Sequence, residues 1–244
     1  MAEEFYKTVN KAPFFKTTIE NAELIKVAYN TFISTKISMI NTIMETCHHL
    51  PNTNVDDITE ALSLCTTRLI SKKYLYGGMG DGGGCHPRDN IALSYLARKF
   101  KLSYNWYDNI MKQRESQTEW LADLIIENKG DRQINILGKT FKPETNIITG
   151  SPSILLKNIL EEKGETVRMW DPYVDSSDIM KVKDDYKWDK IPQLFFIGTQ
   201  HKAFTEFYFM PDSVVIDPFR YLTTHDNVKY IPIGNNIWKN KSGK

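Results

Sequence analysis

Apolar residues in the first half of the chain recur at helical spacing. Residues 14–50 contain no glycine or proline, and their apolar positions repeat every three or four residues. This pattern predicts one helix of about 25 to 30 residues. Further helices are predicted at 54–64, 88–99 and 105–128. Because the first helix is longer than a small domain needs, part of its apolar face is expected to meet a second copy of the chain in a homodimer.

The second half of the chain changes to short apolar runs separated by turn residues. Such runs predict strands at 134–137, 166–170, 194–198, 213–217 and 228–233. Between the first two strands, Ser151 and Pro152 open an apolar stretch that ends at Gly164, the pattern of a capped helix. A strand, a helix and a second strand in succession predict a parallel sheet.

The expected fold class is therefore α plus α/β. We expect an all-helical central domain over residues 1–130, which carries the long helix, followed by a Rossmann-like, doubly wound parallel-sheet domain over residues 131–244.

Composition narrows the function classes. The 244 residues are 41% hydrophobic and carry a formal net charge of +1, so the chain can bury a core but has no overall field for nucleic acid or an anionic membrane. Its three widely spaced cysteines fit neither a disulfide framework nor a four-ligand zinc site, and Cys47 and Cys65 lie in apolar, helical contexts where burial is expected. No window has the roughly 18 apolar residues of a membrane span. We expect a cytoplasmic protein without a metal, nucleic-acid or membrane partner.

A glycine-rich loop is the clearest indication of a binding site in the sequence. Six glycines fall between residues 77 and 84, which favours backbone amides that approach a ligand closely, although a merely flexible loop is the alternative. Cys85 follows the loop just before a predicted helix, where the helix dipole favours thiolate, so it is a candidate nucleophile. Residues 78–83 also spell G-x-G-x-x-G, but no strand precedes them and no acidic residue follows about 20 positions on. We reject the match as a dinucleotide fingerprint.

Six segments, taken together, resemble the UDP-glucose/GDP-mannose dehydrogenase family. The segments are residues 21–32, 77–93, 136–153, 169–175, 196–204 and 214–222, and their order and spacing also fit. The specific part is the pairing of AELIKVAYN with the glycine loop and CHPRD. The resemblance covers the family's central helical domain and its C-terminal UDP-binding domain, and the family's N-terminal NAD-binding domain is expected to be absent.

The resemblance implies an NAD-dependent oxidation of a UDP-sugar at C6, from the alcohol to the carboxylate, through a thiohemiacetal and a thioester. It makes Cys85 the covalent nucleophile. It gives Lys26 and Asn30, which lie four residues apart on one face of the long helix, the support of a developing oxyanion and of an active-site water. Asp89 would take part in the proton relay. From composition alone, Lys26 reads as an ordinary surface lysine.

The resemblance also implies binding residues. The nucleotide sugar would contact Arg68, Tyr76, Gly77, Gly78, Gly80, Gly82, Phe141, Lys142 and Arg220. The cofactor would contact His86, Pro87 and Arg88. Two departures weaken parts of this assignment: Ile147 to Thr149 stand where many members carry an Asp-x-Arg that meets the cofactor, and Arg220 lies one position later than the family's arginine.

Three functional hypotheses follow. The first is the substrate-binding and nucleophile-bearing part of an NAD-dependent UDP-sugar 6-dehydrogenase, with UDP-glucose as the expected substrate, inactive by itself and served by a separate NAD-binding subunit. The second is a non-catalytic dimeric module that binds UDP-sugars or another protein. The third is a cysteine hydrolase that uses Cys85 and one of the five histidines, none of which lies in a recognisable partner motif.

Overall fold

A computed structural model describes residues 2–22, 25, 51–53, 55–69, 78–80, 85–174, 191–224 and 226–234. The chain forms two compact units, residues 1–64 and 65–244. In the first unit, helix α3 (Val55–Ser63) confirms the helix predicted at 54–64, and α1 (Ala2–Val9) was not predicted. Most of the predicted long helix lies outside the described residues, so this helix and the domain boundary near residue 130 stay predictions.

Two helices open the described part of the second unit. Helix α4 (Cys85–Phe100) packs against α5 (Trp106–Lys129), and both confirm predicted helices. Asn105 caps α5 by accepting a hydrogen bond from the amide of Asp108, whose carboxylate receives hydrogen bonds from Ser94 and Arg98 on α4. Helix α4 begins three residues earlier than predicted, so that Cys85 is its first residue. The prediction of a buried Cys65 is wrong, because this residue is exposed in a turn after α3.

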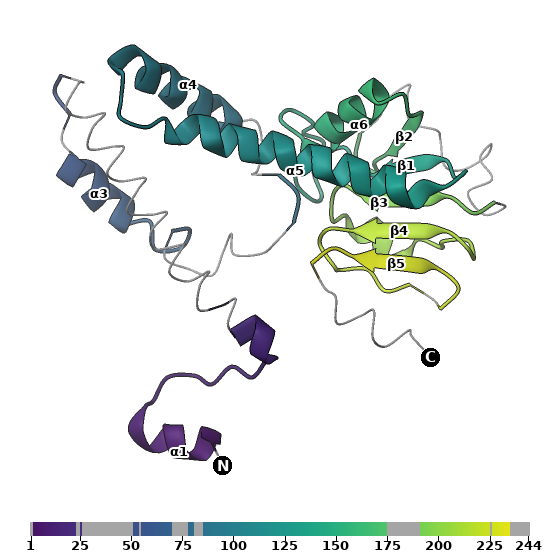
Figure 1. The fold of residues 1–244 in the computed structure, drawn as a ribbon, viewed down its shortest axis with the longest axis horizontal. Coiled ribbons are helices and arrows are strands. Elements are labelled where there is room, and N and C mark those ends of the chain that lie inside the picture. The colour runs from purple at the N-terminus through teal and green to yellow at the C-terminus, as the bar shows by residue number, and fades with distance from the viewer. Residues whose placement is uncertain are drawn as a thin grey trace. The chain divides into compact units, whose positions relative to one another are not determined.

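The sheet has five parallel strands in the order β2-β1-β3-β4-β5, as the ribbon in Figure 1 shows. The strands are β1 (Ile134–Leu137), β2 (Val167–Trp170), β3 (Leu194–Ile197), β4 (Val214–Asp217) and β5 (Lys229–Pro232). Each lies within a run from which a strand was predicted, which confirms the parallel α/β fold. The strand order reverses between β1 and β3, and ligands of doubly wound sheets bind at the carboxyl ends of the strands near such a reversal.

Both faces of the sheet are buried. Alternate residues of β1, β3 and β4, such as Ile136 and Phe196, pack on Leu121 and Leu156 of α5 and α6 (Pro152–Glu162). The other alternate residues pack on the opposite face around Phe204, in the short helix η1 (Lys202–Glu206), which was not predicted. A strand buried on both faces is apolar at nearly every position, which is why β3 reads as an unbroken apolar run and why β1 and β4 are interrupted only by the buried Asn135 and Asp217.

Helix α6 begins and ends as predicted. The Ser151 hydroxyl accepts a hydrogen bond from the Ser153 amide, Pro152 is the first helical residue, and Gly164 follows the helix with φ +87°. The first turn of α6 lies directly on the end of β3, since a Cβ placed on Gly198 would lie 2.3 Å from Ser153 Oγ and 2.7 Å from the Gly138 carbonyl oxygen. Only glycine fits there without a shift of backbone.

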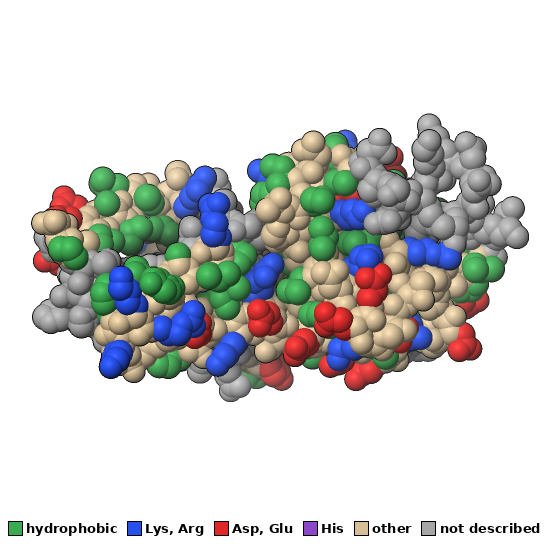
Figure 2. Space-filling model, turned by 90° about the horizontal axis from the view of Figure 1, so that it is seen from above, with side chains coloured by type: hydrophobic (Ala, Val, Ile, Leu, Met, Phe, Trp, Pro, Cys, Tyr) green, Lys and Arg blue, Asp and Glu red, His purple; other side chains and the backbone are tan. Residues whose placement is uncertain are grey.

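Charged side chains of both signs lie interspersed on the face of the molecule that Figure 2 draws, in line with the net charge of +1. Within the described ranges, no helix combines the length and the apolar character needed to cross a membrane.

The contact at Gly198 gives a first prediction. Gly198→Ala is expected to lower the free energy of unfolding by about 2 to 3 kcal/mol, because the added methyl overlaps Ser153 and backbone. Gly164→Ala is the control: it adds a methyl in open space, and only the positive φ costs about 1 kcal/mol. Urea unfolding measures both, and equal losses would contradict the close approach of β3 and α6.

Candidate functional site

Polar residues gather at the carboxyl ends of the strands. Thr140 follows β1, Asp171 follows β2, His201 follows β3 and Asp217 ends β4. Because carboxyl ends of parallel strands share one edge, the sheet brings together residues that are far apart in the sequence. All four are buried.

The centre of this edge is a buried pair, Asp171 and His201. Both side chains are fully buried, and His201 Nε2 lies 3.1 Å from Asp171 Oδ2. The same oxygen accepts hydrogen bonds from the amides of Lys139 at 2.7 Å and Thr140 at 3.1 Å, and Oδ1 accepts one from the amide of Tyr173. Burial by itself raises the pKa of this carboxyl, but the bonds from His201 and the amides outweigh it and hold the pKa at about 2. Asp171 is therefore a carboxylate.

The bonding partners of His201 fix its tautomer. Its Nδ1 accepts a hydrogen bond from the amide of Glu144 at 3.1 Å. Because an amide can only donate, the ring proton must lie on Nε2, which faces Asp171 and, at 3.0 Å, Thr140 Oγ1. The Thr140 hydroxyl donates in turn to the carbonyl of Lys142. A neutral imidazole thus bonds two points of the loop that follows β1, which we call the 139–144 segment.

Glu144 and Tyr173 cover this pair on the solvent side. The Tyr173 hydroxyl donates a hydrogen bond to Glu144 Oε2, and the Lys202 amide donates to Oε1 at 2.9 Å. These bonds lower the pKa of Glu144, the one from Tyr173 having the larger effect. The Tyr173 ring stacks on the His201 ring with centroids 5.1 Å apart.

Asp217 organises a second turn at the same edge. Its Oδ1 accepts hydrogen bonds from the amides of Phe219 and Arg220, and its Oδ2 from those of Tyr221 and Leu222. The Tyr230 hydroxyl also donates to Oδ2, and burial together with the Asp217 charge raises the pKa of that tyrosine. Arg220 has φ +58°, and its guanidinium donates to the carbonyls of Pro218 and Ile233. This predicted substrate residue therefore ties the turn to β5.

The described part of the glycine loop, residues 78–80, is fixed to the same edge. Gln117 of α5 donates to the Gly78 carbonyl at 3.2 Å and accepts from the Gly80 amide at 3.4 Å. Met79 is buried in the core between the helices and the sheet. A Cβ on Gly78 would lie 2.8 Å from the Phe219 ring, and one on Gly80, whose φ is +72°, would lie 2.7 Å from Pro152. Glycine is thus required at both positions, and the loop is held between α5, α6 and the Asp217 turn.

The other predicted site residues fall into three groups. Phe141 is half-buried and Lys142 is exposed, with its ammonium 5.5 Å from the Phe141 ring centroid, so these two lie together at the edge. Cys85, His86, Pro87, Arg88 and Asp89 all lie in the first turns of α4, where Pro87 is half-buried and Arg88 exposed, and the side chains of the other three are not described. Arg68 is exposed in a turn, and no described contact joins it to the edge.

Lys26, Asn30, Tyr76, Gly77 and Gly82 lie outside the described residues, so their roles stay predictions.

Three residues of this edge were missed as site residues from the sequence. Asp171 directly follows β2 and His201 comes four residues after the end of β3, and a polar residue at the carboxyl end of a predicted strand was a usable signal. What the sequence could not show is that they pair across 30 positions. Gln117 carries no such signal, since it is one polar residue among many on α5.

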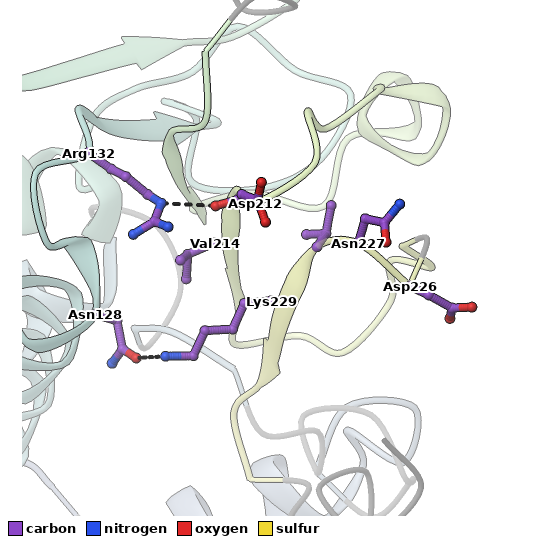
Figure 3. A pocket seen from close by; sticks show the side chains of 8 residues that line it. Asn128, Arg132, Asp212, Val214, Asp226, Asn227 and Lys229 are labelled. Carbon is purple, nitrogen blue, oxygen red and sulfur yellow. Dashed lines mark hydrogen bonds between the residues drawn. The ribbon is translucent and has the colours of Figure 1, made fainter. Parts of the chain in front are cut away.

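A separate hollow lies at the opposite edge of the sheet. It has a volume of about 580 Å³ and opens beside the amino ends of β4 and β5 (Figure 3). Arg132 donates to the Asp212 carbonyl and Lys229 to Asn128 Oδ1 at its wall. None of the predicted site residues lines it.

The lowered pKa of Asp171 gives a prediction about pH. A carboxyl with a lower pKa in the folded state stabilises the fold above its unfolded pKa of 3.8, and this contribution is lost as the pH falls towards about 2. We expect a loss of about 2 kcal/mol between pH 5 and pH 2 that disappears in Asp171→Asn.

At pH 7, Asp171→Asn is expected to cost about 2 to 4 kcal/mol, because the new amide faces donors that it cannot satisfy. Asp226→Asn, at an exposed loop position, is the control and should keep the stability of the parent. Chemical unfolding across the pH range is the measurement. An identical pH dependence in the parent and in Asp171→Asn would refute the assignment.

Comparison with known proteins shows which family this chain resembles. Residues 20–115 match the family model of the UDP-glucose/GDP-mannose dehydrogenase central domain, and residues 135–224 match that of the UDP binding domain. The UDP-glucose 6-dehydrogenase TuaD of Bacillus subtilis is 32% identical over 183 residues, which are 73% of this chain and 39% of TuaD. The chain therefore spans well under half of this relative.

Solved structures share the fold. The GDP-mannose dehydrogenase of Pseudomonas aeruginosa, solved as a ternary complex, aligns with a TM-score of 0.78 and 23% identity over 94% of this chain and 57% of that one. A UDP-glucose dehydrogenase of Pyrobaculum islandicum aligns with a TM-score of 0.56 and 25% identity over 93% and 54%. Because both domain models match in order and together cover most of its residues, this chain belongs to the UDP-glucose/GDP-mannose dehydrogenase family.

Proposed function

We propose that this chain is the substrate-binding and nucleophile-bearing part of an NAD-dependent UDP-sugar 6-dehydrogenase that converts UDP-glucose to UDP-glucuronate. The observation that carries the proposal is the docking of the glycine loop on the sheet edge. The loop that leads to Cys85 contacts Gln117, Pro152 and Phe219, and Pro152 also ends the connection that carries Phe141 and Lys142. A ligand at this edge would meet the loop, Lys142 and the start of α4.

The residue types at this edge suit a nucleotide sugar. Lys142 offers an exposed ammonium for a phosphate, and the amides of a glycine loop can approach an anion or a hexose without steric conflict. Since the net charge is only +1, this local cation rather than an overall field would attract the diphosphate.

Cys85 lies where a nucleophilic thiolate is favoured. As the first residue of a 16-residue helix, it stands at the positive end of the dipole. Its sulfur would add to the C6 aldehyde to form a thiohemiacetal, oxidation of which to the thioester would need NAD as the hydride acceptor, and water would then release the carboxylate and free the thiol. Lys26, Asn30 and Asp89 keep the supporting roles that the family resemblance implies.

The described sheet does not fit a dinucleotide at its switch point. Dinucleotide-binding sheets leave the glycines after β1 open to a pyrophosphate. Here a Cβ on Gly138 would lie 2.5 Å from Thr199, and Gly198 lies against Ser153, so protein atoms fill this space. NAD would have to be held elsewhere, by a separate NAD-binding subunit or domain, and we derive no hydride-transfer step from these residues. The proposal also includes a homodimer through the predicted long helix.

Calorimetric titration tests substrate binding. The chain is expected to bind UDP-glucose saturably and GDP-mannose much more weakly. Lys142→Met should raise the Kd for UDP-glucose about tenfold or more, because it removes a charge-assisted contact to phosphate. Lys229→Met removes the same charge at the opposite edge of the sheet and should leave the Kd unchanged. The proposal fails if the chain does not bind UDP-glucose or if both variants lose affinity equally.

Turnover gives a separate prediction. The G-x-G-x-x-G of residues 78–83 lacks the context of a dinucleotide fingerprint, so the purified 244-residue chain with UDP-glucose and NAD is expected to form no NADH. Absorbance of NADH measures this, with an intact UDP-glucose dehydrogenase as the positive control. Steady NADH formation by the purified chain would overturn this part of the proposal. UDP-glucose binding without any activity in the presence of an NAD-binding subunit would favour a non-catalytic module.

A further inference from the structure

The 139–144 segment is irregular backbone, in which the Phe141 amide donates a hydrogen bond to the Ile147 carbonyl and the Thr145 hydroxyl donates one to the Lys142 carbonyl. It lies between β1 and α6 in neither helix nor strand, and its last residue, Glu144, has φ +56° without being glycine. That backbone region is unfavourable for a residue with a Cβ, so bonds from the rest of the domain must hold it.

We propose that His201 is a positioning residue of the nucleotide-sugar site, which sets the place of Phe141 and Lys142 by bonding both ends of the segment that carries them. This inference rests on the proposed function. Nε2 of His201 faces Thr140 Oγ1 at 3.0 Å on one side of the two residues, and Nδ1 accepts the Glu144 amide at 3.1 Å on the other. Thr140 also donates to the Lys142 carbonyl, which extends the link to the exposed lysine.

A neutral imidazole suits this task. It is rigid, and among side chains it offers one nitrogen donor and one nitrogen acceptor on opposite sides of a planar ring. The Asp171 carboxylate accepts a hydrogen bond from the Nε2–H at 3.1 Å, which keeps the ring proton on Nε2 and leaves Nδ1 free to accept. The histidine itself is anchored by its own amide to Thr199, by its carbonyl to the Tyr221 hydroxyl, and by the edge of Phe204 at 5.4 Å.

The geometry favours positioning over acid-base catalysis. The His201 side chain is fully buried, and both ring nitrogens face groups of the same domain. A substrate at the edge would meet Lys142 rather than the imidazole. The effect of His201 on binding therefore passes through the segment.

Two substitutions separate the two nitrogens. In His201→Asn, the amide oxygen takes the place of Nδ1 and can still accept from the Glu144 amide, while the Thr140 end of the segment stays held by the bond from its amide to Asp171. In His201→Gln, the amide nitrogen takes the place of Nε2 and can still donate to Asp171, but no acceptor remains for Glu144. Phe209→Leu is the matched control, because it loosens the same hydrophobic cluster, and the ring contacts of Phe209 are to Phe195 and Phe207 rather than to His201.

Three measurements on the full chain decide the matter. Chemical unfolding should show that all three variants are less stable. Hydrogen exchange should show faster exchange of the Glu144 amide in His201→Gln, while the Lys139 and Thr140 amides, held by Asp171, keep their protection. Calorimetry should show a Kd for UDP-glucose raised about tenfold in His201→Gln and within about twofold of the parent in His201→Asn and Phe209→Leu.

Other outcomes overturn the inference. Equal Kd values in all variants, or equal losses in His201→Asn and His201→Gln, would reduce His201 to a core residue. If the parent chain does not bind UDP-glucose, the proposed function fails and the role in substrate binding falls with it. Hydrogen exchange of the Glu144 amide then tests by itself whether His201 holds the 139–144 segment. Unchanged exchange in His201→Gln would refute this, and faster exchange would support it.

Discussion

One buried carboxylate organises the carboxyl edge of the sheet. Asp171 is held as an anion in the interior because it receives hydrogen bonds from His201 and from the amides of Lys139, Thr140 and Tyr173. A buried charge is tolerated only when its lone pairs are filled in this way. The constraint works in both directions: the amides must stay at the carboxylate, and so the loops after β1 and β2 are fixed to each other and to β3.

A second buried carboxylate does the same for the far side of the edge. Asp217 gathers four amides and the Tyr230 hydroxyl, and so shapes the turn that presents Phe219. Phe219 is the side chain against which Gly78 lies. The Asp217 turn thereby forms one of the surfaces that receive the glycine loop, and Gln117 of α5 and Pro152 of α6 provide the others. Polar groups in the core serve here to place loops rather than to meet a ligand themselves.

The packing at the switch point bears on where the proposed substrate and the proposed cofactor could bind. In a sheet of order 2-1-3-4-5, the space between β1 and β3 is where a dinucleotide could enter. In this domain, Thr199 and Ser153 occupy it, and the open part of the edge lies instead at Phe141, Lys142 and the glycine loop. A dinucleotide would need the space between β1 and β3 to be open, whereas the proposed substrate would bind beside Lys142 and the glycine loop. The described residues therefore suit the proposed substrate and not the proposed cofactor.

By itself, the sequence determined the elements and the family. Helices α4, α5 and α6 and all five strands could be read from apolar periodicity and caps, because burial on one face of a helix or on both faces of a strand leaves a local pattern. The unbroken motif order from the long helix to the Asp217 turn carried the resemblance, including the residues that stay predictions. The elements it missed, α1 and η1, are short, and short helices leave little periodicity.

Only the tertiary structure decided how the edge is assembled. Asp171 pairs with His201, and that histidine bonds Thr140 and Glu144. Gln117 holds residues 78–80. These contacts join positions that are 30 to 61 residues apart in the sequence. The tertiary structure also turned Arg220 towards backbone carbonyls and placed Cys85 inside the first turn of α4. A hydrogen bond between distant residues depends on where the strands bring them, and no local pattern of hydrophobic and polar positions records that.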